Sequence, residues 1–109
     1  MTELQEMTKA LISFRDERDW KQFHNSKDLA IAINSEASEL LDLFLWKEKE
    51  DFDLDKLKEE LADIFAFCLL LAEKHNLNVR DIVLDKIKLN GEKYPVDKSK
   101  GTAKKYTDL

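Results

Sequence analysis

Four carboxylate side chains occupy positions where the helical pattern calls for apolar residues. Glu36 interrupts an apolar arc, and Glu39 follows it three residues later. Glu60 and Asp63 repeat this spacing, and Asp63 is the only charged residue in the stretch 61–72. Residues three apart on a helix are neighbours on its surface. A carboxylate in an apolar face costs free energy unless it is paired or binds a cation.

Two such pairs on facing helices would repel each other and raise their pKa values, and a divalent cation removes both problems. Oxygen ligands without nearby cysteine select a hard ion, so the sequence predicts Mg²⁺, with Mn²⁺ as the alternative. Mg²⁺ commonly takes its remaining ligands from water and substrate phosphates. The pattern therefore indicates metal-assisted phosphoryl chemistry. The competing interpretation is ordinary surface ion pairing, which is common for Glu and Asp at helical spacing.

A second group of polar residues lies at the end of a predicted helix, where Lys86, Asn90, Lys93 and Tyr94 continue an apolar stripe. Two ammonium groups, an amide and a phenol suit a polyphosphate. Alternatively, the helix end frays and the lysines extend into water. Trp46, expected to end its own helix on the side of the acidic pair, can stack on a nucleobase or belong to the core.

Helices must position these residues, because apolar side chains recur at helical spacing along most of the chain. We expect four helices: Glu3 to Arg18, one that starts after Asn25 or Ser26 and ends near Trp46, Leu54 to Lys74, and Val79 to Lys93. The connections between them are short, which predicts an antiparallel bundle.

Capping residues support these boundaries. Thr2 and Gln5 form a predicted capping box, Asn78 caps the last long helix, and either Asp53 or Asp51 caps the third. Pro95 stops the last long helix. We therefore expect one domain over residues 1–95 and a basic tail over residues 96–109, for which a mobile end is the default expectation.

Composition narrows the fold and function classes. Charged residues make up 38% of the 109 residues and the apolar set 43%, which is typical of a globular protein. Two glycines and one proline are too few for the turns of an all-β fold. The net charge of -5 argues against a nucleic-acid polymer as partner. The fold class is therefore all-α, and the third helix, apolar on nearly all sides, predicts a homo-oligomer.

The cysteine count and the longest apolar run bear on the compartment. One cysteine, Cys68, excludes an internal disulfide and favours an intracellular, cytoplasmic setting. The polar start, Met1 to Gln5, has no signal-peptide pattern. The apolar run 61–72 is shorter than the roughly 20 residues of a membrane span. We therefore expect a buried helix there and no membrane association.

The order of these motifs resembles the all-α nucleoside triphosphate pyrophosphohydrolases, the MazG-like family, and most of all their dCTP pyrophosphatase branch. The ExxE…ExxD motif appears as Glu36-x-x-Glu39 and Glu60-x-x-Asp63. The flanking signatures are Glu17-Arg18-Asp19-Trp20, Gln22-Phe23-His24, Trp46-Lys47, Lys86-x-x-x-Asn90-x-x-Lys93-Tyr94-Pro95 and Lys105-Tyr106-Thr107. The resemblance implies Mg²⁺-dependent hydrolysis of a nucleoside triphosphate, dCTP or a modified pyrimidine deoxynucleotide, to the monophosphate and pyrophosphate.

The resemblance also implies roles for individual residues. Glu36, Glu39, Glu60 and Asp63 would hold the metal, and Glu36 or Glu39 would position the attacking water or take its proton. The substrate would contact Trp20, Lys21, His24, Trp46, Phe67, Lys86, Asn90, Lys93 and Tyr94. The family assembles as dimers or dimers of dimers, so partner chains would complete each pocket.

Two positions depart from the branch and bear on its base selectivity. Leu11 stands where the branch has a substrate-contacting histidine, and Phe67 stands where it has a tyrosine one turn after the last metal ligand. Both changes remove hydrogen-bonding groups, which weakens the expectation of strict cytosine selectivity and leaves the metal chemistry unchanged.

Two other function classes are consistent with parts of the sequence. A non-enzymatic helical adaptor would use the acids as an electrostatic interface and Trp46 as the anchor for a partner. A di-iron carboxylate bundle needs Glu-x-x-His pairs, and neither His24 nor His75 has a glutamate three residues before it. We therefore set the di-iron class aside.

Overall fold

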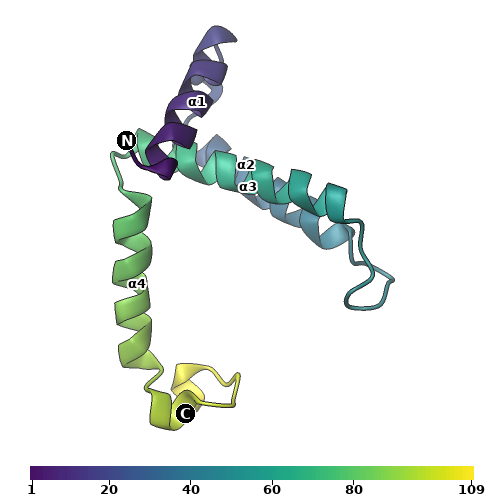
Figure 1. The fold of residues 1–109 in the computed structure, drawn as a ribbon, viewed down its shortest axis with the longest axis vertical. Coiled ribbons are helices and arrows are strands. Elements are labelled where there is room, and N and C mark those ends of the chain that lie inside the picture. The colour runs from purple at the N-terminus through teal and green to yellow at the C-terminus, as the bar shows by residue number, and fades with distance from the viewer. The chain divides into compact units, whose positions relative to one another are not determined.

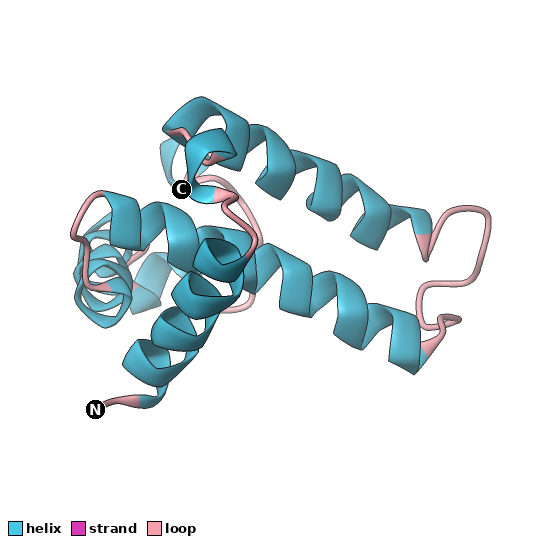
Figure 2. Ribbon diagram, turned by 90° about the horizontal axis from the view of Figure 1, so that it is seen from above, coloured by secondary structure: helices cyan, strands magenta, loops and turns pink.

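The computed structural model describes residues 1–109 and contains helices and loops but no strand (Figure 1, Figure 2). The long helices are α1 (Glu3–Glu17), α2 (Ser26–Asp42), α3 (Leu54–Lys74) and α4 (Val79–Lys93). The short ones are η1 (Lys21–Phe23), α5 (Val96–Ser99) and η2 (Tyr106–Asp108). The all-α prediction is confirmed. The chain divides into two compact units, Met1–Leu77 and Asn78–Leu109, and each is described by itself.

The helix starts follow the predicted caps. Thr2 Oγ1 accepts a hydrogen bond from the Gln5 amide at 3.1 Å, and Gln5 Oε1 accepts one from the Thr2 amide at 2.9 Å, so the capping box is complete. Asn25, Asp53 and Asn78 cap α2, α3 and α4 through their side-chain oxygens. These local hydrogen bonds satisfy amide groups that a helix start leaves without partners.

The end of α2 differs from the prediction. The helix ends at Asp42, and the Phe44 and Lys47 amides bond to carbonyls three residues earlier, at 2.9 and 3.2 Å. Trp46 then adopts a φ of 64°, which breaks the right-handed path. A glycine commonly marks such an end, and here a tryptophan takes that conformation, so the sequence carried no signal for it.

In the first unit, α2 and α3 lie side by side and antiparallel, and α1 packs against α3 (Figure 1, Figure 2). The start of α2 and the end of α3 are joined by a 2.8 Å hydrogen bond between Ser26 Oγ and His75 Nε2. The buried apolar side chains are Leu29, Leu69, Leu70 and Ala72. This small core joins the two helices that carry the acidic residues.

The second unit consists of α4 and the segment that follows it. Tyr106 packs edge-on against Tyr94, with the ring centres 5.9 Å apart, and Lys93 Nζ lies 5.0 Å from the Tyr106 ring. Gly101, with a φ of 79°, supplies the turn between α5 and η2. The segment expected to be a mobile tail therefore contains two helical turns and folds back on the end of α4. No helix in the chain has the length and apolar character needed to cross a membrane.

We expect replacement of Asp53 by Ala to lower the free energy of unfolding by about 1 kcal/mol. Asp53 Oδ1 accepts from the Asp55 amide at 2.9 Å and the Lys56 amide at 3.3 Å, and both amides lose this acceptor. Urea denaturation followed by circular dichroism measures the change. Asp51→Ala is the matched control, because Asp53 and not Asp51 caps α3. Equal stability of the two variants would contradict the cap assignment.

Candidate active site

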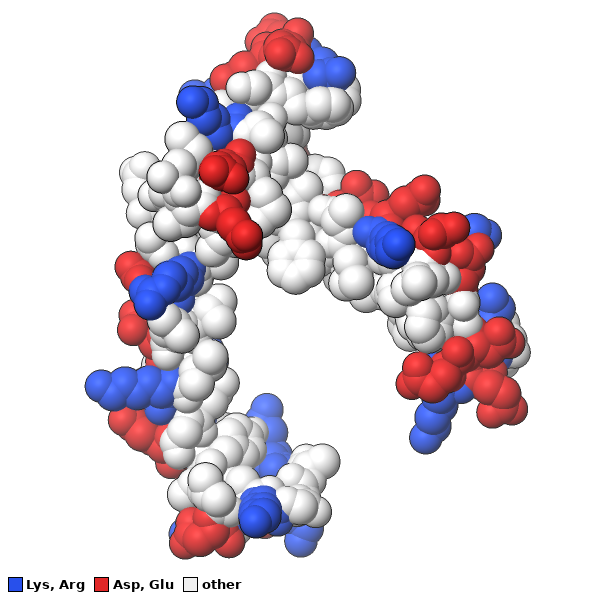
Figure 3. Space-filling view, viewed as in Figure 1, with Lys and Arg blue, Asp and Glu red and all other residues white.

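Antiparallel packing of α2 and α3 brings the acidic pairs together. Carboxylate oxygens of Glu36, Glu60 and Asp63 all lie within 4.8 Å of one another. In Figure 3, acidic side chains gather over the arm that α2, α3 and their connecting loop form. We call Glu36, Glu60 and Asp63 the acid cluster. The motif spacing on each helix and the antiparallel packing of the two helices produce this arrangement.

Two oxygens of the acid cluster lack partners. Glu36 Oε2 and Glu60 Oε2 are both buried, and neither takes part in a hydrogen bond. A buried carboxylate oxygen without a donor is costly. A hard divalent cation coordinated by oxygen ligands would satisfy both atoms at once. The donor set therefore fits Mg²⁺ or Mn²⁺.

The same crowding changes the protonation of the cluster. Burial raises the pKa of Glu36 to about 7, and the neighbouring carboxyl groups of Glu39, Glu60 and Asp63 act in the same direction. Burial also raises the pKa of Glu60; the Glu36 carboxyl opposes this shift, and the charges of Glu39 and Asp63 reinforce it. Without a cation, the cluster therefore retains protons that an exposed glutamate would lose.

Glu39 lies beside the acid cluster and outside the group of three. Its carboxyl group acts on the pKa values of both Glu36 and Glu60, so it is a near neighbour of both. The Glu39 side chain is exposed to solvent. Three of the four predicted ligands thus meet around one point, and the fourth stands at its edge.

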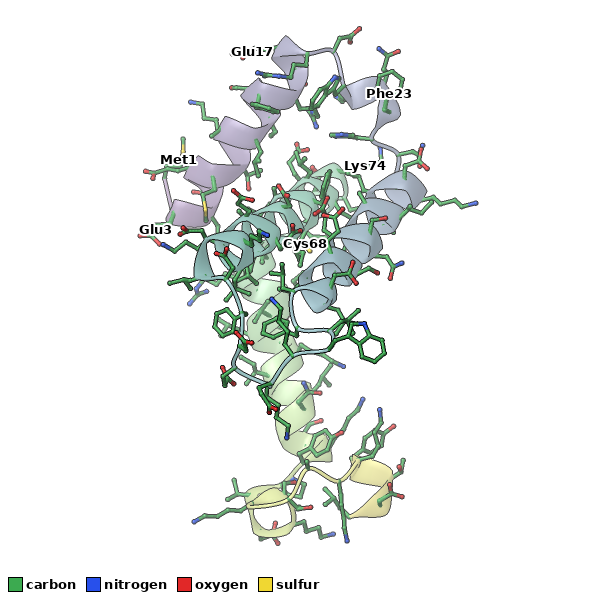
Figure 4. The ribbon with its side chains drawn as sticks, turned by 90° about the vertical axis from the view of Figure 1, so that its right-hand side faces the viewer. Met1, Glu3, Glu17, Phe23, Cys68 and Lys74 are labelled. Carbon is green, nitrogen blue, oxygen red and sulfur yellow. The ribbon has the colours of Figure 1, made fainter.

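A pocket of about 270 Å³ lies in the first unit where α1, η1, the start of α2 and the end of α3 meet. It is lined by Arg15, Lys21, His24, Leu29, Leu70, Glu73, Lys74 and Asn76. We call it the basic pocket. Figure 4 marks its surroundings with the labels on Glu17, Phe23 and Lys74. Two residues predicted to contact substrate, Lys21 and His24, therefore line one cavity.

The remaining predicted substrate residues lie elsewhere. Trp20 is not among the residues that line the basic pocket, and its ring packs edge-on against Phe14 at 5.8 Å. Trp46 lies in the loop after α2 and is fully exposed. The prediction that it ends the helix on the side of the acidic pair is therefore wrong. Phe67 is half-buried on α3, one turn beyond Asp63.

The polyphosphate group predicted on α4 belongs to the second unit. Lys86 and Asn90 are exposed, and Tyr94 is half-buried against Tyr106. Lys93 lies over the same Tyr106 ring. Within this unit, Tyr106 therefore contacts Tyr94 and Lys93, the last two residues of the predicted phosphate-binding group.

Sequence reasoning missed Arg15, the one charged residue that the structure buries. The sequence contained a signal for its burial. Leu4, Thr8, Leu11 and Arg15 follow one another at spacings of four, three and four residues, so they lie along one stripe of α1. That spacing is the same criterion that singled out Glu36. Glu73, Lys74 and Asn76 were also missed, since they line the pocket only through the meeting of separate elements.

The chain is similar to known proteins over most of its length. The chain matches the MazG-like family over residues 31–109, which include all four acids. It is 37% identical to dCTP pyrophosphatase 1 of Bos taurus and 31% identical to that of Homo sapiens, over 97% of this chain and 68% and 67% of those proteins. The crystal structure of a pyrophosphatase from Archaeoglobus fulgidus has a TM-score of 0.79 and 31% identity, covering 87% of this chain and 94% of that one.

The all-helical fold and the family match over residues 31–109 show that the chain belongs to the MazG-like family of pyrophosphohydrolases. Within it, the chain groups with the dCTP pyrophosphatase branch. The predicted enzyme class, nucleoside triphosphate pyrophosphatase, is confirmed by these comparisons. The alternative of a non-enzymatic adaptor is not supported.

We expect Glu36→Gln to stabilise the metal-free protein at neutral and higher pH. A carboxyl group with a raised pKa holds its proton more tightly in the folded state than in the unfolded state. The free energy of unfolding therefore falls as the pH rises from 4.5, the ordinary pKa of glutamate, to about 7, the pKa of Glu36 in the fold. The amide in E36Q cannot ionise, so the variant lacks the loss of stability that ionisation of Glu36 causes. Melting temperatures between pH 4 and 8 in EDTA measure the difference. Glu59→Gln, an exposed neighbour, is the control and should follow the wild-type pH profile.

Proposed function

We propose that this chain hydrolyses a nucleoside triphosphate, dCTP or a modified pyrimidine deoxynucleotide, to the monophosphate and pyrophosphate with Mg²⁺. The observation that carries the proposal is the convergence of Glu36, Glu60 and Asp63 oxygens within 4.8 Å, with two of those oxygens buried and unpartnered. The dCTP pyrophosphatases among its relatives supply the substrate class.

Glu36, Glu60 and Asp63 would hold the metal, and Glu39 would complete its surroundings. When bound, Mg²⁺ supplies charge neutralisation for the phosphates and a more acidic water. Glu39 is suited to accept a proton, because it is exposed at the edge of the cluster and its carboxylate is not among the three that converge. Glu36 would position the attacking water, and its carboxyl group would otherwise stay partly protonated near neutral pH.

The bonds in the proposed step balance without a further reactant. The water oxygen forms a bond to the α-phosphorus, and the bridge between the α- and β-phosphates breaks. Pyrophosphate leaves with the electron pair of that bridge, and the water proton passes to Glu39. Lys86, Lys93, Asn90 and Tyr94 are proposed to hold the phosphates or the sugar, because their donors suit anionic oxygens.

Base recognition is proposed to depend on aromatic faces more than on hydrogen bonds. Trp20 remains 44% exposed and Trp46 fully exposed, so both rings have free faces for a base. Leu11 and Phe67 offer only apolar contact at the two positions where the branch has hydrogen-bonding groups. A site that contacts the base mainly through apolar and aromatic groups tolerates modified pyrimidines better than a site that forms hydrogen bonds to each polar atom of the base.

The single chain leaves much apolar surface uncovered, which supports a homo-oligomer as the working form. Only four apolar side chains are buried, whereas α4 alone leaves Ile82, Val83, Leu84, Ile87 and Leu89 exposed. Exposed apolar area of this extent commonly marks a protein interface. We propose that α4 contacts a second copy of the chain, in a dimer or a dimer of dimers.

The proposed chemistry is tested by replacing Glu39 with Gln. The amide keeps the size of the side chain but cannot accept a proton, so turnover should fall at least about 100-fold, the lower range for general-base removal. Nucleotide affinity should stay within about tenfold, because the acid cluster is intact. Pyrophosphate release, measured over ordinary and modified nucleotides with and without Mg²⁺, gives the rates. Glu59→Gln is the control, and unchanged turnover in E39Q would refute the assignment.

The proposed interface is tested by Ile87→Asp. Ile87 is 60% exposed on α4, and a buried charge at an interface is costly, so the variant should shift toward smaller species. Light scattering after size-exclusion chromatography measures the mass. Lys88→Glu, at the neighbouring exposed position, should keep the wild-type mass. A wild-type monomer at all concentrations would exclude the interface.

A further inference from the structure

The basic pocket contains a buried cation whose hydrogen-bonding groups are largely unused. The Arg15 side chain is only 9% exposed, and its Nε donates to Asp16 Oδ1 at 2.9 Å. Its Nη1 lies 3.9 Å from a Glu73 oxygen, which is beyond hydrogen-bond distance. No atom of the chain accepts a hydrogen bond from either terminal nitrogen. Both terminal nitrogens still reach solvent, so they are free to donate to an acceptor that enters the pocket.

A second group in the same pocket is also without a partner. His24 Nδ1 is buried and takes part in no hydrogen bond. Burial lowers the pKa of His24, and the nearby Arg15 charge lowers it further, so both effects favour the neutral ring. A neutral imidazole still carries one N–H group that can donate to an anion. Arg15 and His24, from separate elements, therefore both offer unused polar atoms to one cavity.

The charge and size of the pocket define what it can hold. Arg15, Lys21 and Lys74 contribute three positive charges, against the Glu73 carboxylate in the lining and the Asp16 carboxylate paired with Arg15, in a chain whose net charge is -5. A planar guanidinium matches the oxygens of a phosphate or carboxylate. The pocket has a volume of about 270 Å³, and a small oxyanion fits these features.

We propose that the basic pocket binds a phosphate-type anion, either inorganic phosphate or pyrophosphate. The anion would accept hydrogen bonds from the Arg15 terminal nitrogens and from His24, with Lys21 and Lys74 neutralising its charge. Neither Glu36 nor any other member of the acid cluster lines this pocket. The inference thus goes beyond the proposed hydrolysis, and its binding test does not require turnover.

The pocket lies two turns away from the acid cluster on the same two helices. Leu29 precedes Glu36 by seven residues on α2, and Leu70 follows Asp63 by seven on α3. Seven residues return to nearly the same helix face about 10 Å along the axis. The pocket is thus placed to hold an anion that comes from the reaction, or a free anion that binds next to it.

The binding test uses the full chain in EDTA, so that no divalent metal links phosphate to the acid cluster. Histidine side-chain resonances are followed by NMR as inorganic phosphate or pyrophosphate is added. The chain has two histidines, and His75 Nε2 is engaged with Ser26 at 2.8 Å outside the pocket lining. The His24 resonances should shift to saturation and those of His75 much less. Absence of a saturable His24 shift with both anions would overturn the proposal.

Substitutions locate the binding. Arg15→Gln should weaken binding about tenfold or more, as expected for loss of a charged hydrogen-bond donor. Arg18→Gln is the matched control on the same helix end, because the Arg18 guanidinium lies 3.6 Å over the Phe14 ring and does not line the pocket. Equal weakening in both variants would mean only a change in net charge and would overturn the proposal.

Because Arg15 is buried, its replacement can destabilise the fold, so a second variant tests the pocket at an exposed residue. Lys74→Gln alters an exposed side chain at the pocket rim and should weaken binding severalfold with the fold intact. Lys58→Gln, exposed on the same helix and away from the pocket, should bind like the wild type. Wild-type affinity in K74Q and in folded R15Q would overturn the proposal.

Inhibition by pyrophosphate separates the two sources of the anion. Competition with the nucleotide would mean that the pocket receives the product or the phosphates of the substrate. Inhibition or activation that is not competitive, and is lost in R15Q, would identify a free anion bound beside the reaction site. A chain that binds phosphate through Arg15 and yet hydrolyses no nucleotide would refute the proposed function and leave this inference standing.

Discussion

The repulsion among carboxylates on two packed helices is the constraint on which the structure depends. Glu36 approaches Glu60 and Asp63 because α2 and α3 pack as an antiparallel pair. The few buried apolar side chains, among them Leu29 and Leu70, hold the pair together against this repulsion. In the absence of a cation the cluster reduces its charge by holding protons, as the raised pKa values show. This crowding lowers the stability of the metal-free fold, and a bound cation would relieve it.

Local sequence determined the parts of the fold that depend on neighbouring residues. Thr2 with Gln5, Asn25, Asp53 and Asn78 cap the helices where the pattern predicted, because a cap requires only a side-chain oxygen and an amide two or three residues later. The meeting of Glu36 with Glu60 and Asp63 was also predictable, whereas Glu39 stands at the edge of the cluster. Four acids within apolar stripes on two adjacent helices leave few other arrangements.

Other features depend on contacts that no local pattern records. The α2 helix ends at Asp42, and Trp46 in the following loop takes a left-handed backbone conformation, which tryptophan seldom adopts. The pocket around Arg15 forms where four separate segments meet, so its lining residues are far apart in the sequence. The packing of Tyr106 on Tyr94 is likewise a contact between a helix end and a later segment. Tertiary structure decides such features, and composition had suggested only a basic tail there.

The exposure of Trp46 gives the chain an optical probe of its own. The chain has two tryptophans; the Trp20 ring rests against Phe14, whereas Trp46 is entirely surrounded by solvent. Indole emission moves to shorter wavelength when water is removed from around the ring. Anything that covers the loop after α2, whether a base, a metal-ordered segment or another chain, therefore changes the colour of the light that this residue emits.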